Sequence, residues 1–357
     1  MTKLILNRRR FLHASAAATL ATPYFYTAAS AQDRVLQVGV YNSAQGGLIK
    51  KEVLPAFEKE FGCKVLTTEG ATLANIASLR ATRDNPVYSV MSMDDVGFPQ
   101  AKAEGLIEEL PMDEIPNLAN VYPRYLFEEN YGVGFAVSIA GLFINPQMSK
   151  PIESYAEIFE PKYARKMMLN TPKNTQSVLM LIVASALATG KSLQEAQYMT
   201  DEGWARLADL KPNVLTIYDG EAQVMMVAQG QATVGGIEYS KAIYPHTRKG
   251  VPLDMTYPKE GAFTGINGIA LVKGAPQREL GLAWIDRLLS PEVQKMLAEA
   301  TLSAPTVKGV EFSDDSLKYL AYPETRMEEL NLFTPDWNYI IPRRAEWLEK
   351  YNQTFAG

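Results

Sequence analysis

The sequence predicts an α/β protein of two lobes, in which each lobe is a mostly parallel sheet flanked by helices. Three observations favour this fold class. Short apolar runs alternate with amphipathic segments, glycine-rich or polar loops separate them, and two long uncharged stretches interrupt the alternation. The chain has 357 residues, of which 47% are hydrophobic, and this is enough to build two hydrophobic cores.

The first part of the chain alternates strand and helix patterns. Strands are expected over residues 35–41, 63–68 and 88–93, and helices over residues 48–61, 72–83 and 98–104. The first strand leads into a loop that contains Gly46 and Gly47, and the third opens directly onto Asp94 and Asp95. Because ligands of such sheets bind at the carboxyl ends of the strands, both loops are candidate binding loops.

Two uncharged stretches, residues 132–145 and 263–272, are expected to be strands that cross between the lobes at the hinge. Between them, strands are predicted over residues 166–169, 215–218 and 232–237, and helices over residues 175–189, 192–207 and 220–229; helices over 280–289 and 291–300 follow the second crossing. The expected division is lobe 1 over residues 32–139 and 266–305, lobe 2 over residues 140–265, and a C-terminal helical segment over residues 306–357 that packs across both lobes.

Residues 1–31 are typical of an export signal. The motif Asn-Arg-Arg-Arg-Phe-Leu over residues 7–12 resembles the twin-arginine pattern, an apolar run follows over residues 14–29, and Ala29-Ser30-Ala31 is a small-x-small cleavage site. A membrane anchor is the alternative, but the run is rich in alanine and threonine, contains Pro23, and is shorter than the roughly 20 strongly apolar residues of a spanning helix. We therefore expect cleavage after Ala31 and a soluble protein in the periplasm.

The composition of the exported chain excludes several function classes. Removal of four basic and no acidic residues with the signal changes the formal net charge from −5 to −9, which argues against nucleic acid or an anionic membrane as partner. Cys63 and His246 are its one cysteine and one histidine, so an internal disulfide, a multi-histidine metal site and a histidine-based triad are not expected. We expect a monomer without cofactor or metal. An exported enzyme is the weaker alternative, because no hydrolase, zinc-protease or dinucleotide motif is found.

Several segments resemble the spermidine/putrescine-binding proteins of ABC importers. They are Tyr-Pro-Lys-Glu-Gly-Ala-Phe over residues 257–263, Asn-Gly-Ile-Ala-Leu over 267–271, and Ala-Trp-Ile-Asp-Arg-Leu-Leu-Ser-Pro-Glu-Val over 283–293. Residues 104–107, 161–163 and 229–235 follow in the order of the same family. The resemblance implies the two-lobe periplasmic-binding-protein fold of type II. It also implies a receptor that closes on a small solute and delivers it to permease and ATPase subunits in the inner membrane.

The chain departs from that family where the resemblance places ligand contacts. Gly265 and Asn267 stand where polyamine receptors have an aromatic and an acidic residue, and Ser43-Ala44-Gln45 replaces their Trp-Thr-Glu. Losing aromatic faces and carboxylates removes cation–π attraction and ion pairing for an alkylammonium. A simple linear polyamine is therefore not the expected solute.

Candidate ligand-binding residues in lobe 1 follow its strands. The first loop contributes Tyr41, Asn42, Ser43 and Gln45. Together with a helix N-terminus they could receive an anion or a polar oxygen, and the alternative is a tight turn with a helix cap. At the end of the third strand, Asp94 or Asp95 could hold an ammonium, and the alternative is a helix cap with a solvated neighbour.

The candidates outside lobe 1's strands are Asn174, Thr175, Glu238, Tyr239, Asn267 and Trp337. Asn174 and Thr175 suit hydroxyl or carboxylate oxygens, although Thr175 could simply cap a helix. Glu238 would be costly to bury without a cation, which a ligand amine, Lys241 or Arg248 could supply. Trp337 matches a tryptophan near the family's C-terminus, and its alternative is a core position.

This pattern favours an amine-bearing, otherwise polar solute, such as an amino-acid or sugar-amine derivative. A receptor of the same fold for ferric ion, or for a phosphorylated or carboxylate solute, is the alternative. The resemblance would give a ferric receptor a tyrosine pair in lobe 2, but Tyr239 and Tyr244 are not adjacent in the sequence.

Overall fold

The computed structural model describes residues 34–220 and 224–355, so the predicted twin-arginine signal and its cleavage site lie outside the described residues. In these two ranges, no helix has both the length and the apolar character that crossing a membrane requires.

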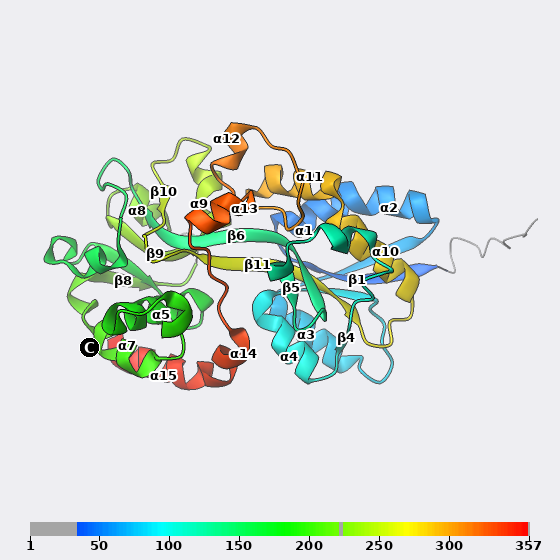
Figure 1. The fold of residues 1–357 in the computed structure, drawn as a ribbon, viewed down its shortest axis with the longest axis horizontal. Coiled ribbons are helices and arrows are strands. Elements are labelled where there is room, and N and C mark those ends of the chain that lie inside the picture. Colours follow the sequence, from blue (N-terminus) through cyan, green and yellow to red (C-terminus); the bar gives the residue numbers. More distant parts are fainter. Residues whose placement is uncertain (1–33, 221–223, 356–357) are drawn as a thin grey trace, which may run out of the picture.

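A continuous mixed sheet runs through the described part of the chain in the order β2-β1-β3-β11-β6-β9-β7-β8. In that order the strands are Lys64–Gly70, Val35–Tyr41, Val90–Asp94, Phe263–Val272, Gly132–Ile144, Val234–Tyr239, Met167–Asn170 and Val214–Tyr218. At one end β1 pairs parallel with β2 and β3, and at the other β7 pairs parallel with β8 and β9. The long antiparallel pair β6 and β11 joins the two ends through the centre of the molecule (Figure 1). The predicted α/β fold with two crossings is confirmed.

Helices cover both faces of the sheet at each end (Figure 1). Near β1 they are α1 (Ala44–Leu48), α2 (Leu54–Phe61), α3 (Thr72–Ala81), α4 (Phe98–Ala103), α10 (Arg278–Leu289) and α11 (Pro291–Thr301). Near β7 they are α5 (Thr175–Thr189), α6 (Leu193–Ala196), α7 (Thr200–Ala208), α8 (Val224–Ala228), α9 (Ser240–Thr247) and α15 (Arg344–Phe355). Short elements complete the fold: β4 (Ile107–Glu108), β5 (Leu126–Phe127), β10 (Asp254–Thr256), α12 (Asp314–Leu317), α13 (Glu324–Glu329) and α14 (Trp337–Ile340).

Of the helix predicted over residues 220–229, the structure describes α8 (Val224–Ala228), and residues 221–223 lie outside the described residues. Two further predicted helices differ from the structure. The first begins earlier than residue 48, because the side chain of Ser43 accepts a hydrogen bond from Gly46 N (3.3 Å) and caps α1, which continues through a π-helical turn into α2. The single helix expected over residues 192–207 is wrong, because the chain breaks into α6 and α7. There Gln197 bonds back to the carbonyl of Gln194, and acidic residues of the next first turn favour a new helix start.

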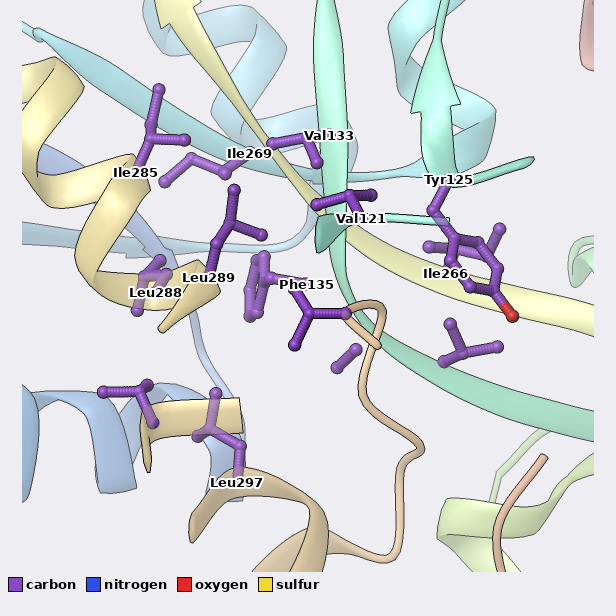
Figure 2. Close-up of a cluster of buried hydrophobic side chains, with 14 of the residues drawn as sticks. Val121, Tyr125, Val133, Phe135, Ile266, Ile269, Ile285, Leu288, Leu289 and Leu297 are labelled. Atoms are coloured by element: carbon purple, nitrogen blue, oxygen red, sulfur yellow. The ribbon is translucent and has the colours of Figure 1, made fainter. Parts of the chain in front are cut away.

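Two large hydrophobic cores meet at the middle of β6. Ile139 belongs to the first core and Ala140, its neighbour in the chain, belongs to the second. Figure 2 shows part of the first core, in which α10 turns Ile285, Leu288 and Leu289 toward the sheet. This spacing of three and four residues puts the three side chains on one helix face.

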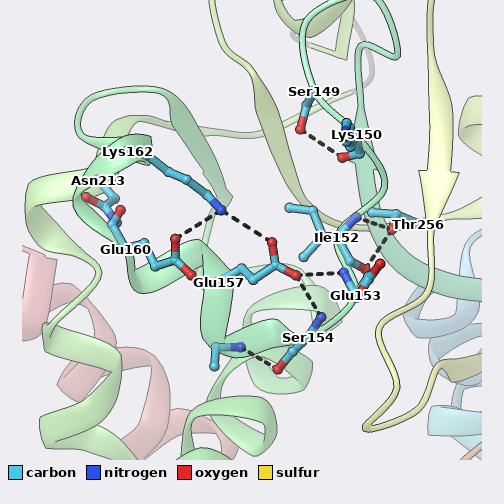
Figure 3. A network of polar contacts seen from close by, with 11 residues as sticks. Ser149, Lys150, Ile152, Glu153, Ser154, Glu157, Glu160, Lys162, Asn213 and Thr256 are labelled. Carbon is cyan, nitrogen blue, oxygen red and sulfur yellow. Dashed lines mark hydrogen bonds and ion pairs between the residues drawn. The ribbon is translucent and has the colours of Figure 1, made fainter.

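A polar network fixes the chain where it leaves β6 (Figure 3). Glu157 accepts hydrogen bonds from the backbone N–H groups of Glu153 (2.8 Å) and Ser154 (3.1 Å), and Lys162 Nζ lies 3.4 Å from the same carboxylate. Thr256 of β10 accepts a hydrogen bond from Ile152 N (2.8 Å). The connection after β6 is thereby tied to the strand that precedes the second crossing.

Candidate functional site

A cavity of about 630 Å³ lies between the two ends of the sheet. One wall comes from the end of β3 and the start of α3, and the other from the start of α5, the end of β9 and the start of α9. A smaller cavity of about 90 Å³ is lined by Asp94, Thr175 and Tyr239, which also line the larger one, and by Asp95 and Trp337. The combined size is typical of sites for small molecules.

Asp94 is held in the cavity wall by a chain of hydrogen bonds that joins the two ends of the sheet. Its Oδ2 accepts from Thr72 Oγ1 (2.7 Å), and its Oδ1 accepts from Asn267 Nδ2 (3.1 Å). Asn267 stands opposite Asp94 in the antiparallel register of β3 and β11, and its Oδ1 accepts from Lys241 Nζ of α9 (3.3 Å). The strand register therefore brings Asp94 and Asn267 together, and α9 adds Lys241.

Asp95 is buried beside the smaller cavity, with 6% of its surface exposed. Its Oδ1 accepts from Val96 N (3.0 Å), whereas neither its Oδ2 nor Nε1 of the buried Trp337 makes a hydrogen bond within the described residues. Burial raises the pKa of Asp95 to about 7, an effect that the nearby Trp337 indole opposes and the charge of Asp94 reinforces. This carboxyl group therefore changes its charge near neutral pH.

Glu238 ends β9 and is buried in the wall of the larger cavity. Its carboxylate accepts hydrogen bonds from Gln176 Nε2 (3.0 Å), Tyr239 N (2.9 Å) and Tyr218 OH (3.2 Å). Burial first, and then the charge of Glu238, raise the pKa of the Tyr218 hydroxyl, which keeps it a donor. These neutral donors fix the direction of the carboxylate.

The two cations considered as partners of Glu238 make other contacts. Lys241 donates to Asn267, and Arg248 donates to the carbonyl oxygen of Glu299 (3.2 Å).

Tyr239 supplies an aromatic face beside Gly265, the position at which the resemblance predicts the loss of an aromatic residue. Its ring lies against Gly265, where an added Cβ would be 2.3 Å from Tyr239 Cε1, and its hydroxyl lies 3.0 Å from Thr175 Oγ1. The inferred loss of an aromatic residue at position 265 is therefore accompanied by a tyrosine from β9. One sequence cannot reveal this exchange, because it depends on two strands meeting in space.

The four candidates of the first loop do not line either cavity. Tyr41 is buried and its hydroxyl accepts from Gly268 N (3.3 Å), so it anchors β11. Asn42 and Ser43 are exposed and Ser43 caps α1, while Gln45 is buried. In contrast, Asn174 and Thr175, at the start of α5, line the larger cavity with Asp94 and Glu238.

Sequence reasoning missed two basic residues of the larger cavity, Lys173 and Arg344, and considered Lys241 only as a partner of Glu238. Arg344 is half-buried at the start of α15, and burial lowers the pKa of its guanidinium. No sequence signal distinguishes it from its neighbour Arg343, because only the packing of the C-terminal segment turns one of the two toward the cavity.

Residues 52–324 match the family model of the bacterial extracellular solute-binding proteins, which is well over half of the chain. The chain belongs to this family. The resemblance seen in the sequence is confirmed, and at the family level the chain belongs with solute-binding proteins rather than enzymes.

Known relatives agree with this assignment. The spermidine/putrescine-binding periplasmic protein of Escherichia coli K12 is 24% identical over 265 residues, which cover 71% of this chain and 73% of that protein. An ABC transporter structure from Clostridium perfringens covers 90% of this chain and 99% of its own, with a TM-score of 0.77 and 20% identity. The periplasmic binding protein MotA of A. tumefaciens B6, in complex with glucopine, covers 90% and 99%, with a TM-score of 0.69 and 19% identity. At these identities, the structural likeness establishes the fold.

Proposed function

We propose that this chain is the periplasmic solute receptor of an ABC importer, and that it binds a small, polar, amine-containing solute and delivers it to the permease. Its family, a relative named as a periplasmic spermidine/putrescine-binding protein and a structural neighbour described as an ABC transporter support this role. The export signal predicted over residues 1–31 supports the location.

We propose that the cavity lies between two lobes that close on the solute, with a boundary near residue 140. The change of core between Ile139 and Ala140 supports a division at residue 140. The C-terminal segment contributes Leu332 to the first core and Trp337 to the second, which supports its packing across both lobes. Closure of the two walls would then enclose a solute.

Several carboxylates lie at this cavity, and this observation is the main support for an amine in the solute. Asp94 and Glu238 lie in its walls, from different lobes, and Asp95 lies beside it. Neutral side chains, those of Thr72 and Asn267 for Asp94 and those of Gln176 and Tyr218 for Glu238, donate hydrogen bonds that orient these carboxylates. A ligand ammonium between the walls would add charge-assisted hydrogen bonds, which are about twice as strong as neutral ones.

A ferric receptor is less well supported. Tyr244 turns its hydroxyl to Tyr257 OH (3.0 Å) and does not line the cavity with Tyr239. Across residues 34–220 and 224–355, no group of three histidine, cysteine, aspartate or glutamate side chains is placed to hold a metal ion.

A thermal-shift screen tests the proposed solute class. The purified protein is heated with amines, amino acids, opines including glucopine, organic acids and sugar phosphates. A solute at a hundredfold excess over its dissociation constant stabilises the protein by about 2.7 kcal/mol, which such a screen resolves. We expect the stabilising compounds to contain an amine, and a set of hits made up only of nitrogen-free anions would contradict the proposal.

Replacing Glu238 with glutamine is expected to weaken binding of the amine at least tenfold, or about 1.4 kcal/mol. The substitution keeps the size of the side chain and removes the negative charge from the cavity wall. Calorimetric titration measures the change. Glu202→Gln, which alters an exposed glutamate of α7, is the matched control and should leave affinity unchanged. Equal affinities for both variants would place Glu238 outside the binding site.

A further inference from the structure

Basic side chains line the same cavity as the carboxylates. Lys173 precedes α5, Lys241 lies in α9 and Arg344 begins α15, so all three come from the side of the cavity opposite β3. In the part of the chain that the structure describes, none of them lies within 4.0 Å of a carboxylate oxygen, although sixteen other ion pairs do form there. The cavity is therefore not uniformly acidic.

Arg344 is the most informative of the three. Its guanidinium is half-buried, and its hydrogen bond within the described residues is a single one, from Nη2 to the carbonyl oxygen of Lys173. A guanidinium has five N–H donors in a planar fork, so four remain for other acceptors. Burial without a carboxylate partner disfavours the charge, which agrees with the lowered pKa of this group. A planar fork with free donors at a cavity wall matches the two oxygens of a carboxylate or phosphonate.

Lys241 also keeps its positive charge in the cavity, although its contacts differ from those of Arg344. Its ammonium donates to the neutral amide oxygen of Asn267 and lies 5.7 Å from the centre of the Tyr239 ring. Neither contact neutralises the charge. Lys173 is exposed at the rim, beside Arg344.

We propose that the solute is a zwitterion, which carries an oxyanion in addition to the amine, and that Arg344 binds this oxyanion with Lys173 beside it. This inference rests on the proposed function and names the second charged group of the solute. The oxyanion is a carboxylate or a phosphonate, since both present oxygens at the spacing of a guanidinium fork. A diamine would instead place its second ammonium in a cavity that already holds three cationic side chains.

Calorimetric titration with five compounds of similar length tests the inference. The compounds are 4-aminobutanoate, 3-aminopropylphosphonate, butane-1,4-diamine, butylamine and butanoate. We expect one or both zwitterions to bind at least tenfold more tightly than the diamine and butylamine, and the better of the two identifies the oxyanion. Arg344→Gln should remove this advantage and should not weaken the binding of butylamine, which has no oxyanion for the guanidinium to hold. Arg344→Lys, which keeps the charge and loses the fork, should give an intermediate loss.

Arg343→Gln is the matched control, because Arg343 stacks on the Tyr339 ring (3.8 Å), donates to Tyr339 O (2.8 Å) and does not line the cavity. It should leave all five affinities unchanged.

The possible failures are distinguishable. A diamine that binds as tightly as the zwitterions overturns the oxyanion and leaves the proposed amine receptor intact. Binding of butanoate without any amine supports the role of Arg344 but contradicts the amine. An Arg344→Gln variant that keeps the preference for zwitterions overturns the assignment of Arg344. If none of the five compounds binds with a dissociation constant of about 1 mM or lower, the zwitterion proposal is overturned.

Discussion

The free energy of unfolding of the wild-type protein is expected to fall by about 4 kcal/mol through Asp95 as the pH rises from about 4 to about 8, and replacing Asp95 with asparagine should abolish this loss. Burial raises the pKa of this carboxyl group from its ordinary value of 3.8 to about 7 in the folded protein. Between these two values the folded state binds more protons than the unfolded state. The free energy of unfolding therefore falls with rising pH across this window, and the loss is complete once the pH exceeds the folded pKa.

The difference between the two proteins isolates this effect from other titrating groups. Denaturant unfolding of wild type and Asp95→Asn is measured across the window, and the variant should become progressively more stable than wild type above about pH 4. Asp84→Asn, at an exposed position after α3, controls for the loss of one negative charge. If wild type and Asp95→Asn keep a constant difference at every pH, Asp95 ionises as an ordinary aspartate.

Replacing Trp284 with alanine is expected to lower the free energy of unfolding by about 3 to 5 kcal/mol, since it leaves a large cavity in the first core. Trp284 is 1% exposed in α10 and contacts the edge of Phe57 with ring centres 5.1 Å apart. Phe57 in turn stacks on Phe61 at 4.4 Å. The substitution removes one member of this aromatic group, which joins α10 to α2.

Chemical denaturation measures the loss. Trp284→Phe keeps most of the volume and should cost clearly less than alanine. Leu66→Ala, at a half-exposed position of β2, should change stability by no more than about 0.5 kcal/mol. A Trp284→Ala protein as stable as the Leu66→Ala protein would show that α10 does not depend on this packing.

The alternation of apolar strands and amphipathic helices was enough to predict the sheet and both crossings, because this periodicity is local. The expected strand over residues 35–41 is β1 as found, and the second crossing, 263–272, is β11. The prediction of a single helix over residues 192–207 was wrong, because the break depends on Gln197. The side-chain oxygen of Gln197 accepts a hydrogen bond from Asp336 N, a partner 139 residues away. No local pattern carries that information.

For the site, the strand-end rule predicted Asp94 and Glu238, which do line one cavity. The same rule also placed Tyr41 and its loop at the ligand, and there the structure shows an anchor for β11 instead. Strand ends are visible in sequence, but whether a side chain turns to the cavity or to a neighbouring strand is decided by packing.

By itself, the sequence determined the fold class and the family, because both are written in residue patterns along the chain. Only the tertiary structure decided the balance of charge at the cavity. Arg344 reaches the cavity from the last helix, and Lys241 of α9 donates a hydrogen bond to Asn267 of β11. The balance of charge at the cavity therefore depends on segments that fold together from distant parts of the chain.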